Sequence, residues 1–140
     1  MIQQTVPSIT IESDLKNLLH VRKFVRAALS DLTNGLVTKE RIDLVELAVN
    51  ELTTNIICHG YQEQLGQTIF IEAECKTSRM VLRFFDQGVA WNPKTVPPPK
   101  FDGSQTSGFG LYLISQAVDE VSYYRDAGGT NITCLSINLK

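Results

Sequence analysis

The sequence of 140 residues has few of the residues that build disulfide frameworks or zinc sites. Its three cysteines, Cys58, Cys75 and Cys134, are odd in number and show no Cys-x-x-Cys spacing, so neither kind of site is indicated. The two histidines add no cluster of transition-metal ligands. Because free cysteines are usually buried, we expect all three in the core or at its border.

Long apolar runs and a strong net charge are also absent. No run approaches the roughly 20 residues that cross a bilayer, and the first ten residues lack the order of a signal peptide. We therefore expect a cytoplasmic protein without a membrane partner. Thirteen Lys and Arg against 15 Asp and Glu give a net charge of −2, which offers no basic surface for direct nucleic-acid binding.

What remains is the composition of a globular protein, with 43% hydrophobic residues, and we expect residues 1–140 to form a single domain. Apolar periodicity predicts helices and strands in a definite order. The predicted elements are a strand near 9–11, helices over 15–32 and 38–59, strands over 68–76 and 80–86, a helix over 108–118, and strands near 120–125 and 130–139. This order predicts an α+β fold, a two-layer sandwich with helices on one face of a mostly antiparallel, mixed sheet.

Local signals give the boundaries of the two long helices. Ser13 or Asp14 is a suitable cap for the first helix, whose predicted apolar face includes Leu15 and Leu19. Thr38 is a suitable cap for the second. Residues 91–107, in contrast, show no periodicity and contain four of the five prolines of the chain. A segment of that length inside a compact domain is usually functional or disordered, and we interpret it as a lid.

The second helix carries an unusual carboxylate. Glu51 has no Lys or Arg three or four residues away, and an acid in such a stripe either faces a cavity or is buried among donors, so it is a candidate general base. Asn55 lies one turn further, about 6 Å along the axis, and its amide oxygen can ligate Mg²⁺ when phosphates supply the other ligands. The alternative for both residues is a structural role at the border and end of a helix.

Two glycine segments flank the predicted lid. Asp86-Gln87-Gly88 ends a strand, where Asp86 can accept a hydrogen bond from an exocyclic amine and Gly88 permits close approach of a ligand. Gly108-Phe109-Gly110 precedes an apolar helical run, and free N–H groups at a helix start suit phosphate. Either segment alone is weak evidence for a ligand site, since such residues also form ordinary turns. The fingerprints of dinucleotide-binding and P-loop folds are absent.

Taken together, these motifs resemble those of the gyrase, chaperone and histidine-kinase ATPase superfamily, and more narrowly the small anti-sigma factor serine/threonine kinases of bacteria. The resemblance runs from about residue 8 to residue 138 in the order of the family. The motifs that carry it are Asn50-Glu51-Leu52-Thr53-Thr54-Asn55, His59-Gly60-Tyr61, Asp86-Gln87-Gly88, Asn92-Pro93, Gly108-Phe109-Gly110-Leu111 and Gly128-Gly129-Thr130.

The resemblance implies a Bergerat-type ATP-binding fold, with ATP and Mg²⁺ held between the helices and the sheet beneath an ATP lid over about 91–107. Glu51 corresponds to the general base and Asn55 to the Mg²⁺ ligand. Asp86 would accept from the adenine amino group, and Thr130 would assist it through water. The remaining implied contacts are Gly88 at the base and Gly108, Phe109 and Gly110 at the phosphates.

Two positions depart from the family pattern. Ala90 replaces the second glycine of Asp-x-Gly-x-Gly, and Thr106 stands where relatives often carry a basic residue ahead of Gly-x-Gly. A cation at the phosphates matters because phosphoryl transfer depends on charge stabilisation. Lys94 or Lys100 in the lid could supply it, or both could be exposed loop lysines.

At the level of function, the resemblance implies an ATP-dependent protein kinase that phosphorylates an anti-anti-sigma partner on serine and sequesters a sigma factor. The nucleotide would set the choice of partner, and because many members dimerise, a homodimer is a further expectation. The main alternative, motivated by Ala90 and Thr106, is a non-catalytic, nucleotide-gated binding protein that regulates transcription by partner switching. A fragment of a sensor histidine kinase is disfavoured, because no phosphoacceptor helix pair precedes the motifs.

Overall fold

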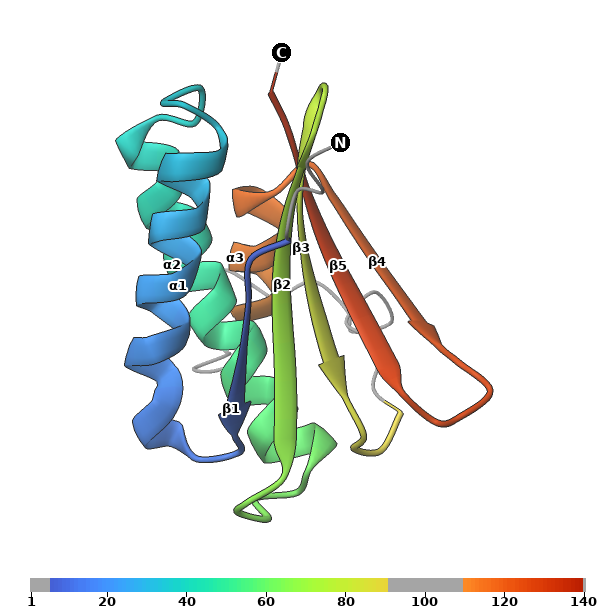
Figure 1. Cartoon of the computed structure of the whole chain (residues 1–140). Coiled ribbons are helices and arrows are strands. Elements are labelled where there is room, and N and C mark those ends of the chain that lie inside the picture. The colour runs from blue at the N-terminus through green and yellow to red at the C-terminus, as the bar shows by residue number, and fades with distance from the viewer. Residues whose placement is uncertain (1–5, 91–109, 140) are drawn as a thin grey trace, which may run out of the picture.

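The computed structural model describes residues 6–90 and 110–139 (Figure 1). The predicted lid over 91–107 and the proposed contacts Lys100, Gly108 and Phe109 therefore lie outside the described residues, as do Lys94 and Thr106. The elements are β1 (Ser8–Glu12), α1 (Leu18–Leu32), α2 (Lys39–Asn55), β2 (Thr68–Lys76), β3 (Arg79–Asp86), α3 (Gly110–Ala117), β4 (Glu120–Arg125) and β5 (Asn131–Asn138).

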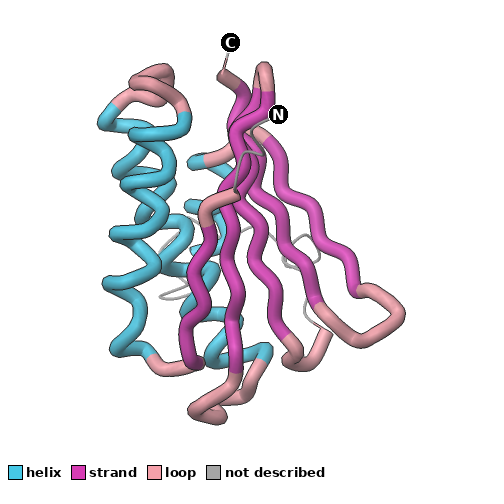
Figure 2. Tube along the Cα trace, in the orientation of Figure 1, coloured by secondary structure: helices cyan, strands magenta, loops and turns pink. Residues whose placement is uncertain are grey.

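The strands form one sheet in the order β1-β2-β3-β5-β4, and the three helices lie on one side of it (Figures 1 and 2). This confirms the predicted α+β sandwich. The prediction of a mixed sheet was wrong for the described strands, because every pairing among them is antiparallel. β3 and β4 run in the same direction, but β5 lies between them and pairs with both, so no parallel pair forms.

The first helix begins with a 3-10 turn over Leu15–Asn17, and the Asp14 side chain caps it by accepting a hydrogen bond from the Lys16 N–H at 3.0 Å. The apolar face differs from the prediction at its start. Leu15 and Leu19 are 51% and 48% exposed, so they do not belong to the buried face. That face is formed by later residues of the helix, namely Val21, Val25, Ala28 and Leu29.

The second helix begins as predicted, with the Thr38 side chain accepting from the Arg41 N–H at 3.2 Å. Its α-helical part ends at Asn55, and the chain then makes a π-helical segment over Ile56–Gly60. A π-helical segment is wider than an α-helical turn and is frequent at functional sites. Within the described part of the chain, no helix has the length and apolar character needed to cross a bilayer.

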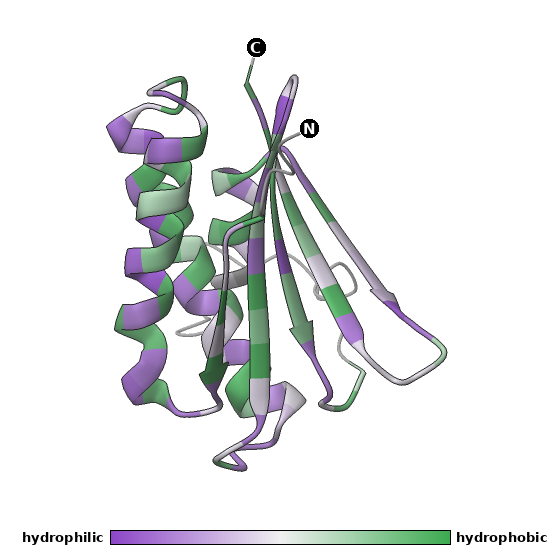
Figure 3. Ribbon diagram, viewed as in Figure 1, coloured by the Kyte–Doolittle hydropathy of each residue, from purple (hydrophilic) through white to green (hydrophobic). Residues whose placement is uncertain are grey.

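The core lies between the helical layer and the inner face of the sheet. Along β2, buried and more exposed residues alternate, whereas β5 is buried at nearly every position; Figure 3 shows the hydropathy of each strand. The largest contributions from the inner face come from Ile69, Ile71, Met80, Leu82, Phe84, Leu135 and Ile137. Asp86 is the next residue of this face after Phe84, so the alternation of β3 places a carboxylate at the end of an apolar row.

Candidate functional site

Asp86 is a buried carboxylate, 5% exposed, at the last position of β3. Its Oδ1 accepts hydrogen bonds from the Gly88 backbone N–H and from Asn131 Nδ2, both at 2.9 Å. Burial raises the pKa of Asp86, while these two hydrogen bonds and the charge of Arg125 act in the opposite direction. Among the described residues, both bonds end on Oδ1, which leaves Oδ2 to accept a hydrogen bond from a ligand.

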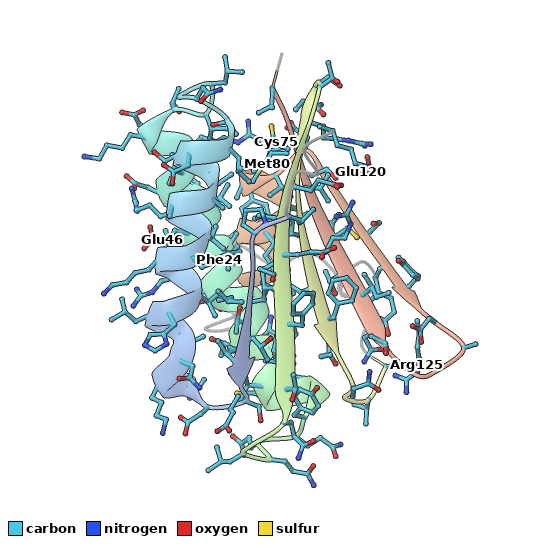
Figure 4. All side chains as sticks on the ribbon, in the orientation of Figure 1. Phe24, Glu46, Cys75, Met80, Glu120 and Arg125 are labelled. Atoms are coloured by element: carbon cyan, nitrogen blue, oxygen red, sulfur yellow. The ribbon has the colours of Figure 1, made fainter. Side chains whose placement is uncertain are left out.

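Asn131 is a site residue that the sequence did not predict. It is 2% exposed, and its Nδ2 donates to Asp86 Oδ1 and to the Gly88 carbonyl oxygen, both at 2.9 Å. Its Oδ1 accepts from the Tyr123 hydroxyl at 2.7 Å and from Arg125 Nη1 at 2.9 Å. Arg125 lies at the end of β4 (Figure 4) and also donates to the Gly88 carbonyl. This network fixes the orientation of the Asp86 carboxylate.

Gly88 packs directly against the backbone of Gly60. A Cβ at Gly88 would lie 2.5 Å from the carbonyl carbon of Gly60 and 3.0 Å from its Cα, and it would overlap the carbonyl oxygen as well. The neighbouring Val89 N–H donates to that same oxygen at 2.8 Å. Packing within the chain therefore requires glycine at position 88, and the residue is not by itself an indication of a ligand.

Gly88→Ala is expected to lower the free energy of unfolding by about 2 kcal/mol or more, because backbone atoms of Gly60 cannot rotate away from the added methyl group. Urea unfolding measures this loss. Gly128→Ala is the matched control, since a Cβ there has its nearest neighbour, Asp126 Oδ1, at 3.4 Å. Equal stability of the two variants would show that the Gly60–Gly88 contact does not constrain the fold.

Glu51 and Asn55 are both half-buried on α2. At α3, the space where a Cβ of Gly110 would stand is taken by the Glu51 side chain, whose Oε2 would be 2.5 Å away. Beyond Asn55, the π-helical segment leads to Gly60, where an added Cβ would lie 3.6 Å from Asp86 Oδ1. The helical segment formed by α2 and the π-helical turn therefore lies against the start of α3 at Glu51 and close to the end of β3 at Gly60.

Among the described residues, the hydrogen-bond donors of Asp86 are Gly88 and Asn131, and Thr130 is not one of them. Its Oγ1 accepts a hydrogen bond from Gln87 Nε2, the side chain next to Asp86 in the chain. The Asp126-Ala127-Gly128-Gly129 turn that precedes Thr130 is held by the Asp126 side chain, which accepts from the Gly128 and Thr130 N–H groups at 2.9 Å. Assistance from Thr130 through water stays a prediction, whereas Asn131 is the direct partner of Asp86.

An open hollow of about 280 Å³ lies beside these residues. It is lined by residues of the 60–67 loop, by 87–89 and by Arg125. Gly88 belongs to its wall, but Glu51, Asn55 and Asp86 do not. The hollow is therefore a neighbour of the predicted site and does not coincide with it.

The donor set around Asn55 is compatible with Mg²⁺ and not with a metal held by protein alone. Over residues 6–90 and 110–139, no three His, Cys, Asp or Glu side chains lie close enough to hold an ion. Mg²⁺ accepts one or two protein oxygens when phosphates and waters complete its shell. A single amide oxygen beside a triphosphate fits that requirement.

Comparisons with known proteins agree with this arrangement. Residues 11–136 match the family described as histidine kinase-like ATPase domain. The chain is 30% identical over 115 residues to serine-protein kinase RsbW of Halalkalibacterium halodurans, covering 74% of this chain and 68% of that protein. It is 26% identical over 116 residues to serine-protein kinase RsbW of Bacillus thuringiensis, covering 76% and 71%.

A solved structure supports the fold alone. The histidine kinase domain of a blue-light activated histidine kinase from Erythrobacter litoralis aligns with a TM-score of 0.51 at 19% sequence identity. The match covers 71% of this chain and 45% of that chain. The helical layer and the antiparallel sheet are therefore a known arrangement.

Proposed function

The chain belongs to the histidine kinase-like ATPase domain family and, within it, to the anti-sigma factor kinases, and on this premise we propose that it transfers the γ-phosphoryl group of ATP to a serine of an anti-anti-sigma partner. We further propose that it sequesters a sigma factor in the alternative complex. At the level of the family, its role is that of a kinase in partner switching.

The observation that carries the proposal is the oriented carboxylate of Asp86. Two donors hold its Oδ1 at 2.9 Å, and we assign Oδ2 to accept from an exocyclic amine such as that of adenine. The Asp86 side chain is only 5% exposed, and because burying a carboxylate costs free energy, such an acid is a candidate binding group. An adenine base is the ligand of this family that offers the required donor.

Glu51 is the proposed general base. Its carboxylate accepts the proton of the serine hydroxyl while the serine oxygen bonds to the γ-phosphorus. The bond between that phosphorus and the β,γ-bridging oxygen breaks, and ADP leaves with its electron pair. Asn55, one turn along α2, holds Mg²⁺ through its amide oxygen, and the ion neutralises phosphate charge when bound.

The alternative function is partner binding without catalysis. Ala90 favours it, because a methyl group replaces the second glycine of the motif at the end of the described segment. The Ala90 side chain is exposed, so the methyl group displaces no part of the core. A direct measurement of transfer separates the two functions.

The experiment uses ATP labelled at the γ-phosphate, the full chain, and a candidate anti-anti-sigma protein with and without its acceptor serine. We expect label on the serine-containing partner alone, and release of that partner after phosphorylation. A stable complex without transferred label supports the non-catalytic alternative. Absence of ATP binding contradicts the kinase and also a partner-binding protein that is gated by nucleotide.

A further inference from the structure

Gly110 and Glu51 occupy the same small volume where α3 begins. A Cβ built on Gly110 would lie 2.5 Å from Glu51 Oε2, 3.1 Å from its Cδ and 3.1 Å from its Cβ. The first two atoms belong to a side chain that can rotate, but the Cβ is fixed to the backbone of α2. The Glu51 side chain thus occupies the space where a Cβ of Gly110 would stand.

The two helices cannot separate freely to make room. Ile114 and Ala117 of α3 are buried, at 2% and 0% exposure. Arg41, in the first turn of α2, donates through Nε to the Ala117 carbonyl at 2.9 Å and pairs with Asp119 at 3.1 Å. Because α3 is held to α2 at its far end, an added methyl group at position 110 acts chiefly on the Glu51 side chain.

We propose that Gly110 is a positioning residue for Glu51. Because it has no Cβ, Gly110 lets the Glu51 carboxylate lie against the first turn of α3. The positive end of the helix dipole stabilises a negatively charged group there. The inference rests on the proposed function, in which Glu51 is the base. It gives Gly110 a role different from the phosphate contact that the resemblance implies, because the atoms that fill the space beside its Cα belong to Glu51.

The test is a double-mutant cycle with Gly110→Ala and Glu51→Asp. Gly110→Ala is expected to lower kcat for phosphoryl transfer about 30-fold and to leave Kd for ATP within about threefold, since a displacement near 1 Å at a reacting group is costly. Aspartate is one methylene shorter, so its carboxylate no longer reaches the place that Glu51 Oε2 occupies 2.5 Å from the new methyl group, although the Cβ of residue 51 stays at 3.1 Å. In the Glu51→Asp background, the same substitution is expected to cost less than about threefold.

Gln116→Ala, at an exposed position of the same helix, is the control and is expected to keep wild-type kcat. Two kinetic results would overturn the inference. One is an increase of Kd for ATP that matches the loss of kcat, because Gly110 would then serve the phosphates. The other is an equal loss in both Glu51 backgrounds, because the effect would then not pass through the carboxylate.

A crystal structure of Gly110→Ala provides a readout that does not depend on activity. We expect the Glu51 carboxylate to move by about 1 Å or more, because van der Waals radii exclude its present place. A carboxylate that stays in place beside the added methyl group contradicts the inference. If the wild-type chain binds ATP but transfers no phosphoryl group, the proposed function fails, and this structural result still decides the positioning role.

Discussion

Glu51→Gln is expected to reduce phosphoryl transfer about 10³-fold while Kd for ATP stays within about threefold, the usual size of the loss when a general base is removed. Glutamine keeps the length of the side chain and therefore its fit against Gly110. It lacks the basic oxygen that would accept the serine proton. Single-turnover transfer of labelled phosphate measures the first quantity, and calorimetry measures the second.

Glu40→Gln is a matched control, because Glu40 is an exposed acid in the first turn of the same helix. It is expected to transfer phosphate at the wild-type rate. Transfer that persists in Glu51→Gln would remove Glu51 from the role of base. A large loss of ATP affinity in that variant would instead make Glu51 a binding residue.

Asp86→Asn is expected to weaken ATP binding about 100-fold, because an amide in place of Oδ2 would present a donor to the adenine amino group and leave both unpaired. The fold keeps its internal hydrogen bonds, since the amide oxygen can still accept from the Gly88 N–H and from Asn131 Nδ2. Calorimetric titration with ATP measures the loss. Asp31→Asn, at an exposed position of α1, is the control.

The same variant is expected to change how stability depends on pH. Burial raises the pKa of Asp86 above its ordinary value of 3.8, so the folded chain holds this proton more tightly than the unfolded chain does. The contribution of Asp86 to stability is complete below the ordinary pKa and is lost as the pH rises through the raised one. Asp86→Asn removes that loss.

Urea unfolding at a series of pH values from acid to neutral tests this linkage. The free energy of unfolding of Asp86→Asn, relative to the wild type, should increase as the pH rises from 3.8 through the raised pKa. At neutral pH the variant is expected to be at least as stable as the wild type. A variant that is less stable at neutral pH would show that the ionised carboxylate stabilises the fold.

The fold could be predicted largely because its signals are local. Thr38 and Asp14 cap the helices by hydrogen bonds to N–H groups two or three residues away, and such contacts are visible in the sequence. The sheet order is different, because β5 pairs with β4 across a short turn but also pairs on its other side with β3, which lies far earlier in the chain. No local pattern specifies the pairing of β5 with β3, and the prediction that the mostly antiparallel sheet is mixed was wrong for the described strands.

In the candidate site, too, the residues with local signals could be predicted, and those that depend on distant contacts could not. Glu51 and Asp86 are recognisable from their neighbours in the chain, as an acid without basic partners and an acid at the end of an apolar strand. Asn131 reaches Asp86 only through the β3–β5 register, in which the two residues face each other. The steric roles of Gly88 and Gly110 depend on Gly60 and Glu51, which are far away in the sequence.

The most direct measurement is a calorimetric comparison of two Mg²⁺-bound, non-hydrolysable triphosphates that differ only at the base. One carries adenine, and the other carries hypoxanthine, which has a carbonyl oxygen in place of the amino group. If Asp86 reads the amino group, the adenine nucleotide binds one site per chain and the hypoxanthine nucleotide binds about 100-fold more weakly. Equal affinities, or no binding of the adenine nucleotide, would contradict an ATP site at Asp86.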